Sequence, residues 1–320
     1  MLENMRKKRV LFPGGGGFVR SHLCTRLIEN YQNIHCSDNL YSNEQENMTH
    51  FVSSTYSEFV RHDVTFPFNA KVDEIYNPAY PTSPIHFRRD PILITKTRIH
   101  GTINVLGLAK RPSVKFLEAS IGGVYGDPRV HPQSEGYWRT ANPIGFRSCR
   151  DQSLRLTETL FTDRLKQHKV ITKIVRIFYK HDPKIHHKDE KVTVDVIVQA
   201  LRSQNVTKFC NWTQSKLFRY VADLAENLMA AISRSLKVSG TINLRGAGKI
   251  KNKVVAQQII SLANPKSRII YKDILPNDPV RRKSHTEVPG NVLNWNANED
   301  RAVRSSKPIP YVRLRRSNQR

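Results

Sequence analysis

The sequence predicts an α/β protein, namely a Rossmann-type doubly wound parallel sheet followed by a smaller C-terminal α/β domain. Three observations support this fold class. A glycine-rich turn joins a short apolar run to a segment of helical periodicity near the N-terminus, an aspartate closes the next apolar run, and apolar runs then alternate with helical segments as far as residue 180. Strands and helices alternating in this way are buried best in a parallel sheet covered on both faces.

The first strand, helix and second strand are the clearest elements. Residues 10–12 form an apolar run that leads through Pro13 into four consecutive glycines. Apolar residues then recur at helical spacing over 18–28, and a second apolar run at 34–37 ends at Asp38. The order strand, glycine turn, helix, strand and acid is typical of the opening of a nucleotide-binding βαβ unit.

The later elements continue the alternation. Strands are expected at 59–60, 74–76, 114–120 and 170–177, and helices at 91–110 and 151–167. Beyond residue 180, helices are expected at 192–202, 221–235 and 253–263, and short strands at 241–244 and 267–271. The chain therefore divides into a basic extension (1–7), a nucleotide-binding domain (8–180), a substrate-binding domain (181–300, with some chain exchange between the two) and a basic tail (301–320). The tail holds seven Lys or Arg residues and no acid, so we expect it to be disordered.

The glycine turn predicts a dinucleotide site. Gly14 and Gly17 provide the tight backbone turn and the close approach of a pyrophosphate, but Arg20 stands where a third glycine would let the helix pack against the sheet. Asp38 follows Gly17 by 21 residues, the distance expected for a carboxylate that binds a ribose. This acid favours NAD over NADP as the cofactor.

Charge is the unusual feature of the composition. Lys and Arg number 52 against 27 Asp and Glu, a formal net charge of +25. We expect non-specific binding of polyanions through the tail, but no nucleic-acid-binding motif accompanies the charge. No apolar stretch has the length of a membrane helix and no export signal is recognisable, so a cytoplasmic location is expected. The four cysteines lack C-x-x-C spacing, so no metal site is expected.

From about residue 8 to residue 300, the sequence resembles the UDP-glucuronate decarboxylases, which are extended short-chain dehydrogenases. The segments that carry the resemblance are Gly14–Leu23, Asp38–Asn39, His62–Val64, Gly101–Thr102, Leu106–Arg111, Val124–Pro128, His131–Glu135, Tyr137–Trp138, Asn142–Gly145, Arg176–Phe178, Tyr220–Leu224, Asp278–Pro279 and Arg281–Arg282. The segments from Tyr125 to Pro128 and from His131 to Glu135 are specific to this branch, whereas the glycine turn is shared by many families.

The resemblance implies a reaction and a set of partners. Members of the family hold NAD, oxidise the sugar of UDP-glucuronate at C4, release CO₂ and return the hydride to give UDP-xylose. The protein supplies orientation and a Tyr-x-x-x-Lys proton relay, helped by a Ser or Thr hydroxyl and a Glu. The family forms homodimers through helices that correspond to about 91–110 and 148–166 here. Some members are membrane-anchored in the Golgi lumen, and we expect no such anchor in this chain.

The resemblance also assigns ligand-binding residues. The expected cofactor-binding residues are Gly14, Gly17, Phe18, Val19, Asp38, Asn39, Tyr41, Ser42, Asp63, Val64, Thr97 and Ala119. The expected UDP-sugar-binding residues are Lys96, Asn104, Gly107, Lys110, Arg111, Lys216 and Arg282. Lys216 stands where the family has an arginine, so the charge is kept but the bidentate fork is lost.

The sequence departs from the family at the catalytic positions. Arg150 and Leu154 occupy the positions of the Tyr-x-x-x-Lys pair, and Ile121, Gly122 and Gly123 replace a Thr-Ser-Glu run. An arginine stays protonated and cannot act as a base. Of the catalytic side chains, Ser120 alone is a candidate for retention. Further departures are Pro13 for a threonine, Arg20 for the third glycine, Arg98 for an asparagine and Tyr179 for an asparagine.

Several functions remain open from these residues. The favoured hypothesis is a UDP-glucuronate decarboxylase homologue that is catalytically impaired or inactive and whose binding of NAD is weakened by Arg20 and Leu154. The first alternative is a non-catalytic protein that binds NAD or a UDP-sugar, or that pairs with an active relative. A basic nucleic-acid-binding protein is a weaker alternative, and a decayed gene copy would carry the same substitutions.

Overall fold

The large parallel sheet predicted from the sequence is the centre of the molecule. The computed structural model describes residues 7–30, 32–41, 54–77, 84–108, 114–126, 130, 133–137, 141–178, 180–181, 192–209, 215–217, 219–233, 240–244, 249–263 and 266–272. Seven strands form the sheet: β1 (Arg9–Pro13), β2 (Asn33–Asp38), β3 (Ser57–Arg61), β4 (Glu74–Asn77), β5 (Lys115–Ile121), β6 (Ile171–Ile177) and β11 (Gly240–Leu244). All of the pairings among these strands are parallel.

The strand order is β11-β6-β5-β4-β1-β2-β3. The chain runs outward from β1 to β3, returns to the other side of β1 at β4, and continues outward to β6. The order therefore reverses between β1 and β4, and ligands of open α/β sheets bind beyond the carboxyl ends of the strands at such a point. This arrangement confirms the predicted Rossmann-type fold class.

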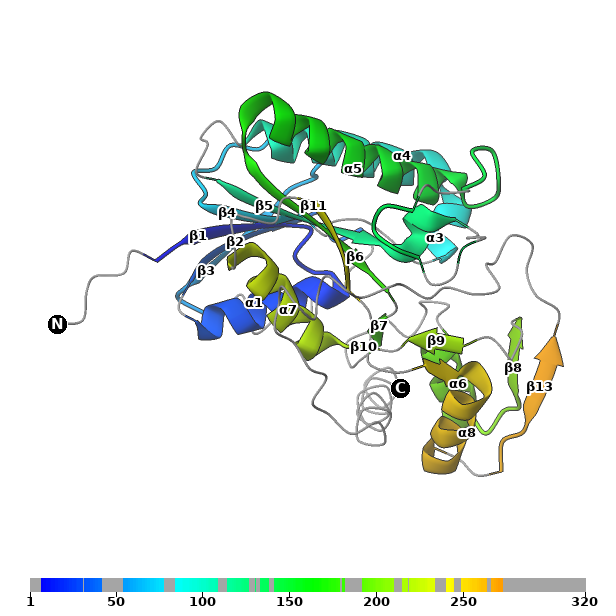
Figure 1. The fold of residues 1–320 in the computed structure, drawn as a ribbon. Coiled ribbons are helices and arrows are strands. Elements are labelled where there is room, and N and C mark those ends of the chain that lie inside the picture. Colours follow the sequence, from blue (N-terminus) through cyan, green and yellow to red (C-terminus); the bar gives the residue numbers. More distant parts are fainter. Residues whose placement is uncertain are drawn as a thin grey trace.

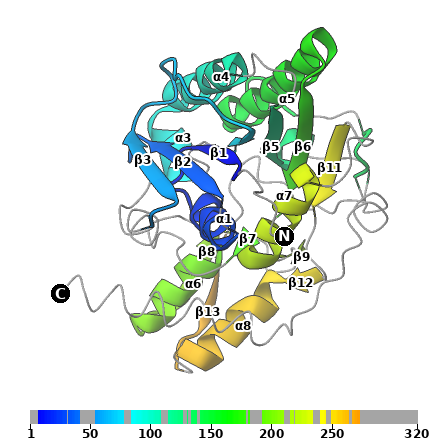
Figure 2. The same cartoon turned by 90° about the vertical axis from the view of Figure 1, so that its left-hand side faces the viewer.

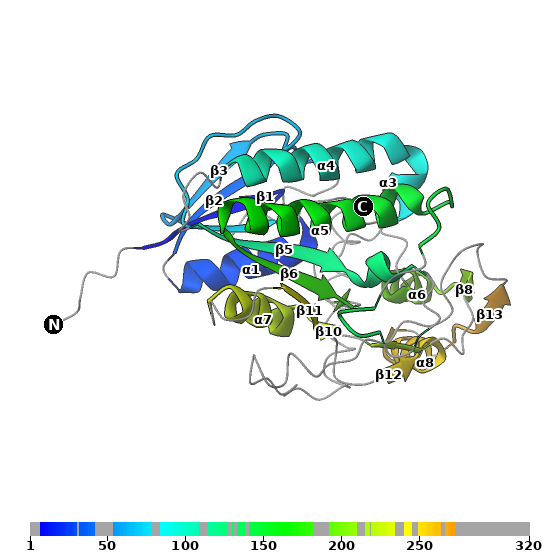
Figure 3. The ribbon, with the colours of Figure 1, turned by 45° about the horizontal axis from the view of Figure 1, so that its top comes forward.

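Helices cover both faces of the sheet. Helices α1 (Phe18–Glu29) and α7 (Val221–Ser233) lie side by side on one face, and α4 (Pro91–Gly107) and α5 (Ser148–His168) lie side by side on the other (Figure 1). The same two pairs are seen on opposite sides of the sheet in Figure 3. One apolar core fills the space under α1 and α7, and a second fills the space under α4 and α5. Two short helices, α3 (Pro84–Arg89) and η2 (Gly122–Tyr125), follow β4 and β5.

Local sequence sets the ends of the two long helices. Asp90 is the N-cap of α4, since its side chain accepts a hydrogen bond from the backbone N–H of Leu93 at 2.8 Å, and Pro91 follows at the first helical position. Helix α5 ends at Lys169, whose left-handed backbone (φ 52°) lets its N–H reach the Leu165 carbonyl at 2.9 Å. These ends place the first turns of α4 and α5 near the carboxyl edge of the sheet.

The smaller part of the molecule lies beyond that edge. It contains β7 (Lys180–His181), α6 (Val192–Leu201), β8 (Val206–Phe209), β9 (Ser215–Leu217), β10 (Arg219–Tyr220), β12 (Lys249–Lys251), α8 (Asn252–Ala263) and β13 (Ile269–Lys272). Figure 2 shows α6 and α8 with β8 and β13 apart from the large sheet. Their facing sides bury an apolar cluster that includes Val196, Ile197, Ala256 and Ile259. Between these segments the chain returns to the large sheet as α7 and β11, so residues of the expected substrate-binding domain complete the nucleotide-binding layer.

The buried side of α4 differs from the apolar pattern in the sequence. Ile94 and Leu106 are buried as that pattern suggests, but Ile103 is 52% exposed. Arg98 is only 3% exposed and lies with Ile94 and Val105 on the side that faces the sheet. A charged residue therefore occupies a core position in this helix.

Candidate functional site

The glycine turn after β1 has the backbone geometry that the sequence predicts. Gly14 has a positive φ of 69°, a conformation that side-chain-bearing residues rarely adopt. A Cβ on Gly15 would lie 1.8 Å from the Cys36 sulfur, so this position must also be glycine. Gly17 has extended backbone and is the N-cap of α1, which has no acidic residue in its first turn. The turn thus presents the positive end of α1 at the switch point of the sheet.

Arg20 lies against this turn. Its side chain is buried, and a Cβ on Gly17 would lie 3.0 Å from Nη1 and 3.1 Å from Cζ of Arg20. The guanidinium therefore folds back onto the part of the turn where a phosphate would approach the backbone. The sequence predicted crowding between α1 and the sheet, and the structure adds that the bulk of Arg20 also lies over Gly17.

Asp38 joins the turn to the end of β2. One carboxylate oxygen accepts a hydrogen bond from the backbone N–H of Gly16 at 2.9 Å, and the other accepts one from Leu40 at 2.7 Å. Asp38 is therefore a structural part of the turn, and its binding of a ribose stays a prediction.

The expected adenosine-binding residues lie together beyond β2 and β3. Asn39 donates to Asp63 at 3.0 Å, and Thr65 donates twice to the other oxygen of Asp63. Burial raises the pKa of Asp63, but the hydrogen bonds from Thr65 and Asn39 outweigh it and hold the pKa below its usual value. Asn104, expected to bind substrate, instead reaches the Val64 carbonyl at 2.9 Å in this structure.

The remaining expected ligand residues fall into three groups. Val19 and Ala119 are buried, Thr97 is partly buried, and Tyr41, Lys96 and Gly107 are exposed. Phe18 begins α1 and Lys216 belongs to β9, but the positions of their side chains are not described. Ser42, Lys110, Arg111 and Arg282 lie outside the described residues, as do Tyr179, the extension 1–6 and the tail 301–320.

The positions expected to correspond to the family's catalytic group lie together, with Gly123 in η2 after β5 and Arg150 and Leu154 near the start of α5. A Cβ on Gly123 would lie 3.0 Å from Asp151 Oδ1, 3.3 Å from Arg150 Nη1 and 3.3 Å from Leu154 Cδ1. Arg150 also forms a contact of 3.3 Å with Asp151. Leu154 is fully buried and packs in the apolar cluster that contains Val124. The absence of a side chain at Gly123 leaves room for Asp151, Arg150 and Leu154, so these residues pack together.

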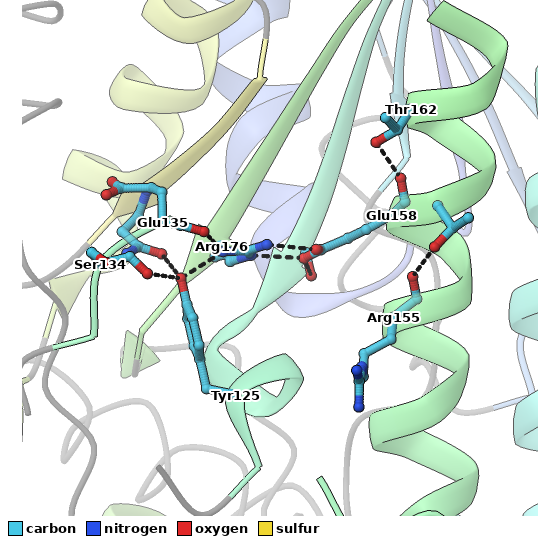
Figure 4. Close-up of polar contacts among 10 residues, drawn as sticks. Tyr125, Ser134, Glu135, Arg155, Glu158, Thr162 and Arg176 are labelled. Carbon is cyan, nitrogen blue, oxygen red and sulfur yellow. Dashed lines mark hydrogen bonds and ion pairs between the residues drawn. The ribbon is translucent and has the colours of Figure 1, made fainter. Parts of the chain in front are cut away.

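Ser120 belongs to a buried polar network on the α5 side of the sheet. Its hydroxyl donates to Glu158 Oε1 at 2.7 Å. Arg176 binds the same carboxylate with two hydrogen bonds, Nε to Oε1 at 2.9 Å and Nη2 to Oε2 at 2.8 Å. The third nitrogen, Nη1, donates to the Tyr125 hydroxyl at 2.6 Å and to the Glu135 carbonyl at 2.9 Å (Figure 4). In this structure Ser120 thus acts as part of the scaffold that holds β5, β6 and α5 together.

A second buried Arg–Glu pair lies on the same side of the sheet. Arg98 on α4 approaches Glu118 on β5, with 3.8 Å between Nη1 and Oε1. Asn77 at the end of β4 donates to Glu118 Oε2 at 2.8 Å. Burial raises the pKa of Glu118 to about 8, against the opposing effects of Arg98 and Asn77.

Sequence reasoning did not identify these two pairs. It singled out Arg98 only as a departure from the family and left Glu118 and Glu158 without a role. The usable signal was the presence of charged residues inside apolar runs: Glu118 in 115–121, Arg176 in 171–177 and Arg98 on the buried side of α4. Charged side chains are rarely buried unless they are paired.

The described residues contain neither a metal-binding cluster nor a membrane-spanning helix. No group of three or more His, Cys, Asp or Glu side chains is arranged there to hold a metal ion. No helix in this part of the chain is long and apolar enough to cross a membrane.

The fold is shared by sugar-nucleotide enzymes. UDP-glucose 4-epimerase from Thermotoga maritima superposes with a TM-score of 0.85 at 19% identity, covering 96% of this chain and 99% of that one. UDP-glucuronic acid 4-epimerase from Bacillus cereus, solved with UDP-glucuronic acid and NAD, gives a TM-score of 0.84 at 19% identity and covers 96% and 99% of the two chains.

The sequence is more similar to another set of proteins. UDP-glucuronic acid decarboxylase 5 of Arabidopsis thaliana is 38% identical over 288 residues, which are 90% of this chain and 84% of the relative. UDP-glucuronic acid decarboxylase 1 of Xenopus tropicalis is 36% identical over 312 residues, which are 98% and 74% of the two chains. The model of the NAD dependent epimerase/dehydratase family matches residues 10–244. On this similarity, the chain belongs to the NAD dependent epimerase/dehydratase family, among the UDP-glucuronic acid decarboxylases.

Proposed function

We propose that this protein binds NAD and a UDP-sugar in the manner of its family but does not convert UDP-glucuronate to UDP-xylose. The observation that carries the proposal is the group formed by Gly123, Arg150 and Leu154 after β5. At the two relay positions it contains one permanent cation and one apolar side chain, and neither can take up a proton. Asp151, the neighbouring carboxylate, already contacts Arg150 at 3.3 Å.

The apolar surroundings of Leu154 make recovery of the relay by a small movement implausible on physical grounds. The side chain is buried with Val124, Tyr125 and Phe178. A lysine at this position would have to bury its ammonium group among these residues unless the cofactor's ribose hydroxyls received it. The whole group would have to change together for proton transfer to return.

NAD fits part of the site. In the family's reaction NAD would supply hydride transfer to and from the sugar. The turn from Gly14 to Gly17 suits the phosphates, and the carboxylate of Asp38 at the end of β2 is placed as expected for the adenosine ribose. Arg20 lies over Gly17 and opposes close approach of the pyrophosphate, and Leu154 cannot hydrogen-bond the nicotinamide ribose. We therefore propose weakened NAD binding, since each lost charged hydrogen bond is worth about 1.5–3 kcal/mol.

The test combines binding with turnover. The purified full chain is incubated with UDP-glucuronate and NAD, and UDP-xylose is measured against a blank without enzyme. Calorimetry with NAD and with UDP is carried out on the same preparation. We expect measurable binding of both and no product above the blank. Product formation would contradict the proposed inactivity. If neither NAD nor UDP binds, the proposed binding role is contradicted.

A second proposal concerns pairing between copies of the chain or with an active relative. Helices α4 and α5 lie side by side on the outside of the molecule, and each exposes large apolar side chains: Ile92 is 77% exposed and Leu156 is 46% exposed. Arg98 is turned toward the sheet and does not interrupt this surface. We expect sedimentation to reveal a dimer, and Leu156→Glu to shift it toward monomer without loss of fold.

A further inference from the structure

Glu118 is held in a buried cluster with Asn77 and Arg98. It lies opposite Asn77 in the register of β4 and β5, and Oε2 accepts the hydrogen bond from that side chain at 2.8 Å. The other oxygen, Oε1, is 3.8 Å from Arg98 Nη1 and makes no hydrogen bond within the described part of the chain. The carboxyl group is therefore only partly compensated.

The cluster is next to the cofactor positions along the chain. Glu118 precedes Ala119, Arg98 follows Thr97, and Asn77 is the last residue of β4, the strand beside the glycine turn. Ala119 and Thr97 are both expected to contact the cofactor. Glu118 thus lies one residue along β5 from an expected cofactor contact, and its partner Asn77 ends β4, one of the two strands between which the strand order reverses.

The charges around Glu118 come from each element packed against it. Arg98 on α4 and Arg20 on α1 favour its ionised form, whereas Glu158 on α5 disfavours it. On β6, Arg176 is already engaged by Glu158, and β4 contributes the neutral Asn77. Desolvation is the largest effect, and it brings the pKa of Glu118 to about 8. The group therefore changes charge within the range of ordinary buffers.

The charge of the pair depends on this proton. With Glu118 ionised, Arg98 and Glu118 are together neutral. With Glu118 protonated, the pair carries the full positive charge of Arg98 in a low-dielectric interior, where charge acts over longer distances than in water. A pyrophosphate bound at the glycine turn is an anion, so it is bound more tightly when the pair is positive.

We propose that Glu118 regulates the charge of the nucleotide site, so that a dinucleotide binds with uptake of a proton by Glu118. Glu118 is in this sense a positioning residue, because it acts on the ligand through the charge of Arg98 and does not touch the ligand. The inference rests on the proposed binding of NAD. It predicts that affinity for NAD falls by up to about tenfold as pH rises from well below to well above pH 8.

The experiment measures proton uptake directly. NAD is titrated into the wild-type full chain by calorimetry near pH 8, in two buffers of different ionisation enthalpy, and the difference in heat gives the number of protons taken up. We expect net uptake of a fraction of a proton with NAD and none with adenosine, which lacks the phosphates. Glu118→Gln keeps an acceptor for Asn77 and cannot titrate, so its NAD affinity should be independent of pH in this range.

The matched control is Glu74→Gln. Glu74 is also a buried glutamate on the neighbouring strand, but it lies at the opposite end of β4 and pairs with Lys8 at 2.8 Å. We expect this variant to keep the wild-type pH profile. NAD binding without proton uptake by the wild type, or equal uptake with adenosine, overturns the inference alone. No NAD binding at any pH overturns the proposed binding function, and this inference with it.

Discussion

Two arginine–glutamate pairs are buried on the same side of the sheet, and they differ in the distance between their charged atoms and in how fully those atoms are hydrogen-bonded. Arg176 and Glu158 form two parallel hydrogen bonds of 2.9 and 2.8 Å, and Tyr125 accepts a further hydrogen bond from Arg176 (Figure 4). Ser120 donates to the Glu158 carboxylate. Arg98 and Glu118 approach only to 3.8 Å, and Oε1 of Glu118 accepts no hydrogen bond from the described residues.

The difference shows that burial alone does not make an ion pair a structural support. Removing two charges from water costs several kcal/mol per ion, and the attraction between them recovers that cost only with close contact and satisfied lone pairs. The first pair meets these conditions and connects β6 to α5. The second pair does not, and its carboxyl group keeps a raised pKa. One pair is therefore a scaffold, and the other is a site where charge can change.

The largest expected effect on stability comes from breaking the Arg176–Glu158 pair. Glu158→Leu leaves the Arg176 guanidinium buried without its carboxylate, and we expect a loss of about 3–5 kcal/mol in the free energy of unfolding. Urea unfolding measures it. The control is Asp163→Asn on the same helix, an exposed residue whose ion pair with Lys166 is 3.9 Å long and should matter by less than about 0.5 kcal/mol. Similar losses in the two variants would show that the network is not a scaffold.

A smaller loss is expected at the second pair. Glu118→Leu should cost about 1–3 kcal/mol, less than Glu158→Leu, because a carboxyl group with a pKa of about 8 carries little negative charge at neutral pH. Replacing both partners, as Arg98→Met with Glu118→Leu, should recover most or all of the loss, since well-packed apolar residues often replace a buried pair at no cost. If the double variant is less stable than Glu118→Leu alone, the two side chains are not coupled as described.

The pH dependence of stability should separate the two pairs further. The pKa of Glu118 is raised from 4.5 to about 8 in the folded protein, so the folded state binds the proton more tightly than the unfolded state. The resulting stabilisation is complete below pH 4.5 and is lost as pH rises toward 8. Melting temperatures across this window should fall less steeply for Glu118→Gln than for the wild type. Parallel profiles for the two proteins would contradict the assignment.

The smallest expected change in stability concerns the glycine turn. Arg20→Gly should tighten NAD binding by about tenfold and raise the melting temperature slightly, because it removes the side chain that lies over Gly17. Arg20→Met keeps much of the bulk and removes the charge, so it separates the two properties. If Arg20→Met weakens binding while Arg20→Gly tightens it, the charge of Arg20 attracts the pyrophosphate and its bulk is the obstacle. If neither variant changes binding, Arg20 is harmless to the turn.

The fold and part of the site could be predicted because their signals are local. The glycine turn, the aspartate at the end of β2 and the alternation of apolar periods depend on neighbouring residues, and the strands and helices that were predicted lie within a few residues of their predicted positions. The grouping of Gly123, Arg150 and Leu154 followed from the family resemblance. Which side of α4 is exposed was harder to predict from the sequence. The isoleucines at 99 and 103 share an apolar pattern with Ile94, although Ile103 faces outward.

The sequence by itself thus determined the sheet, the turn and the chemical types present at the site, since periodicity and backbone geometry act over short stretches of chain. Only the tertiary structure decided which charges face one another. Ser120 and Glu158 are 38 residues apart, and Arg176 and Tyr125 are 51 apart, so their contacts exist only once β5 and β6 are neighbours. The cost of burying a charge and the attraction that offsets it depend on distances between such segments. For that reason two Arg–Glu pairs of the same composition became a scaffold in one place and a titrating group in the other.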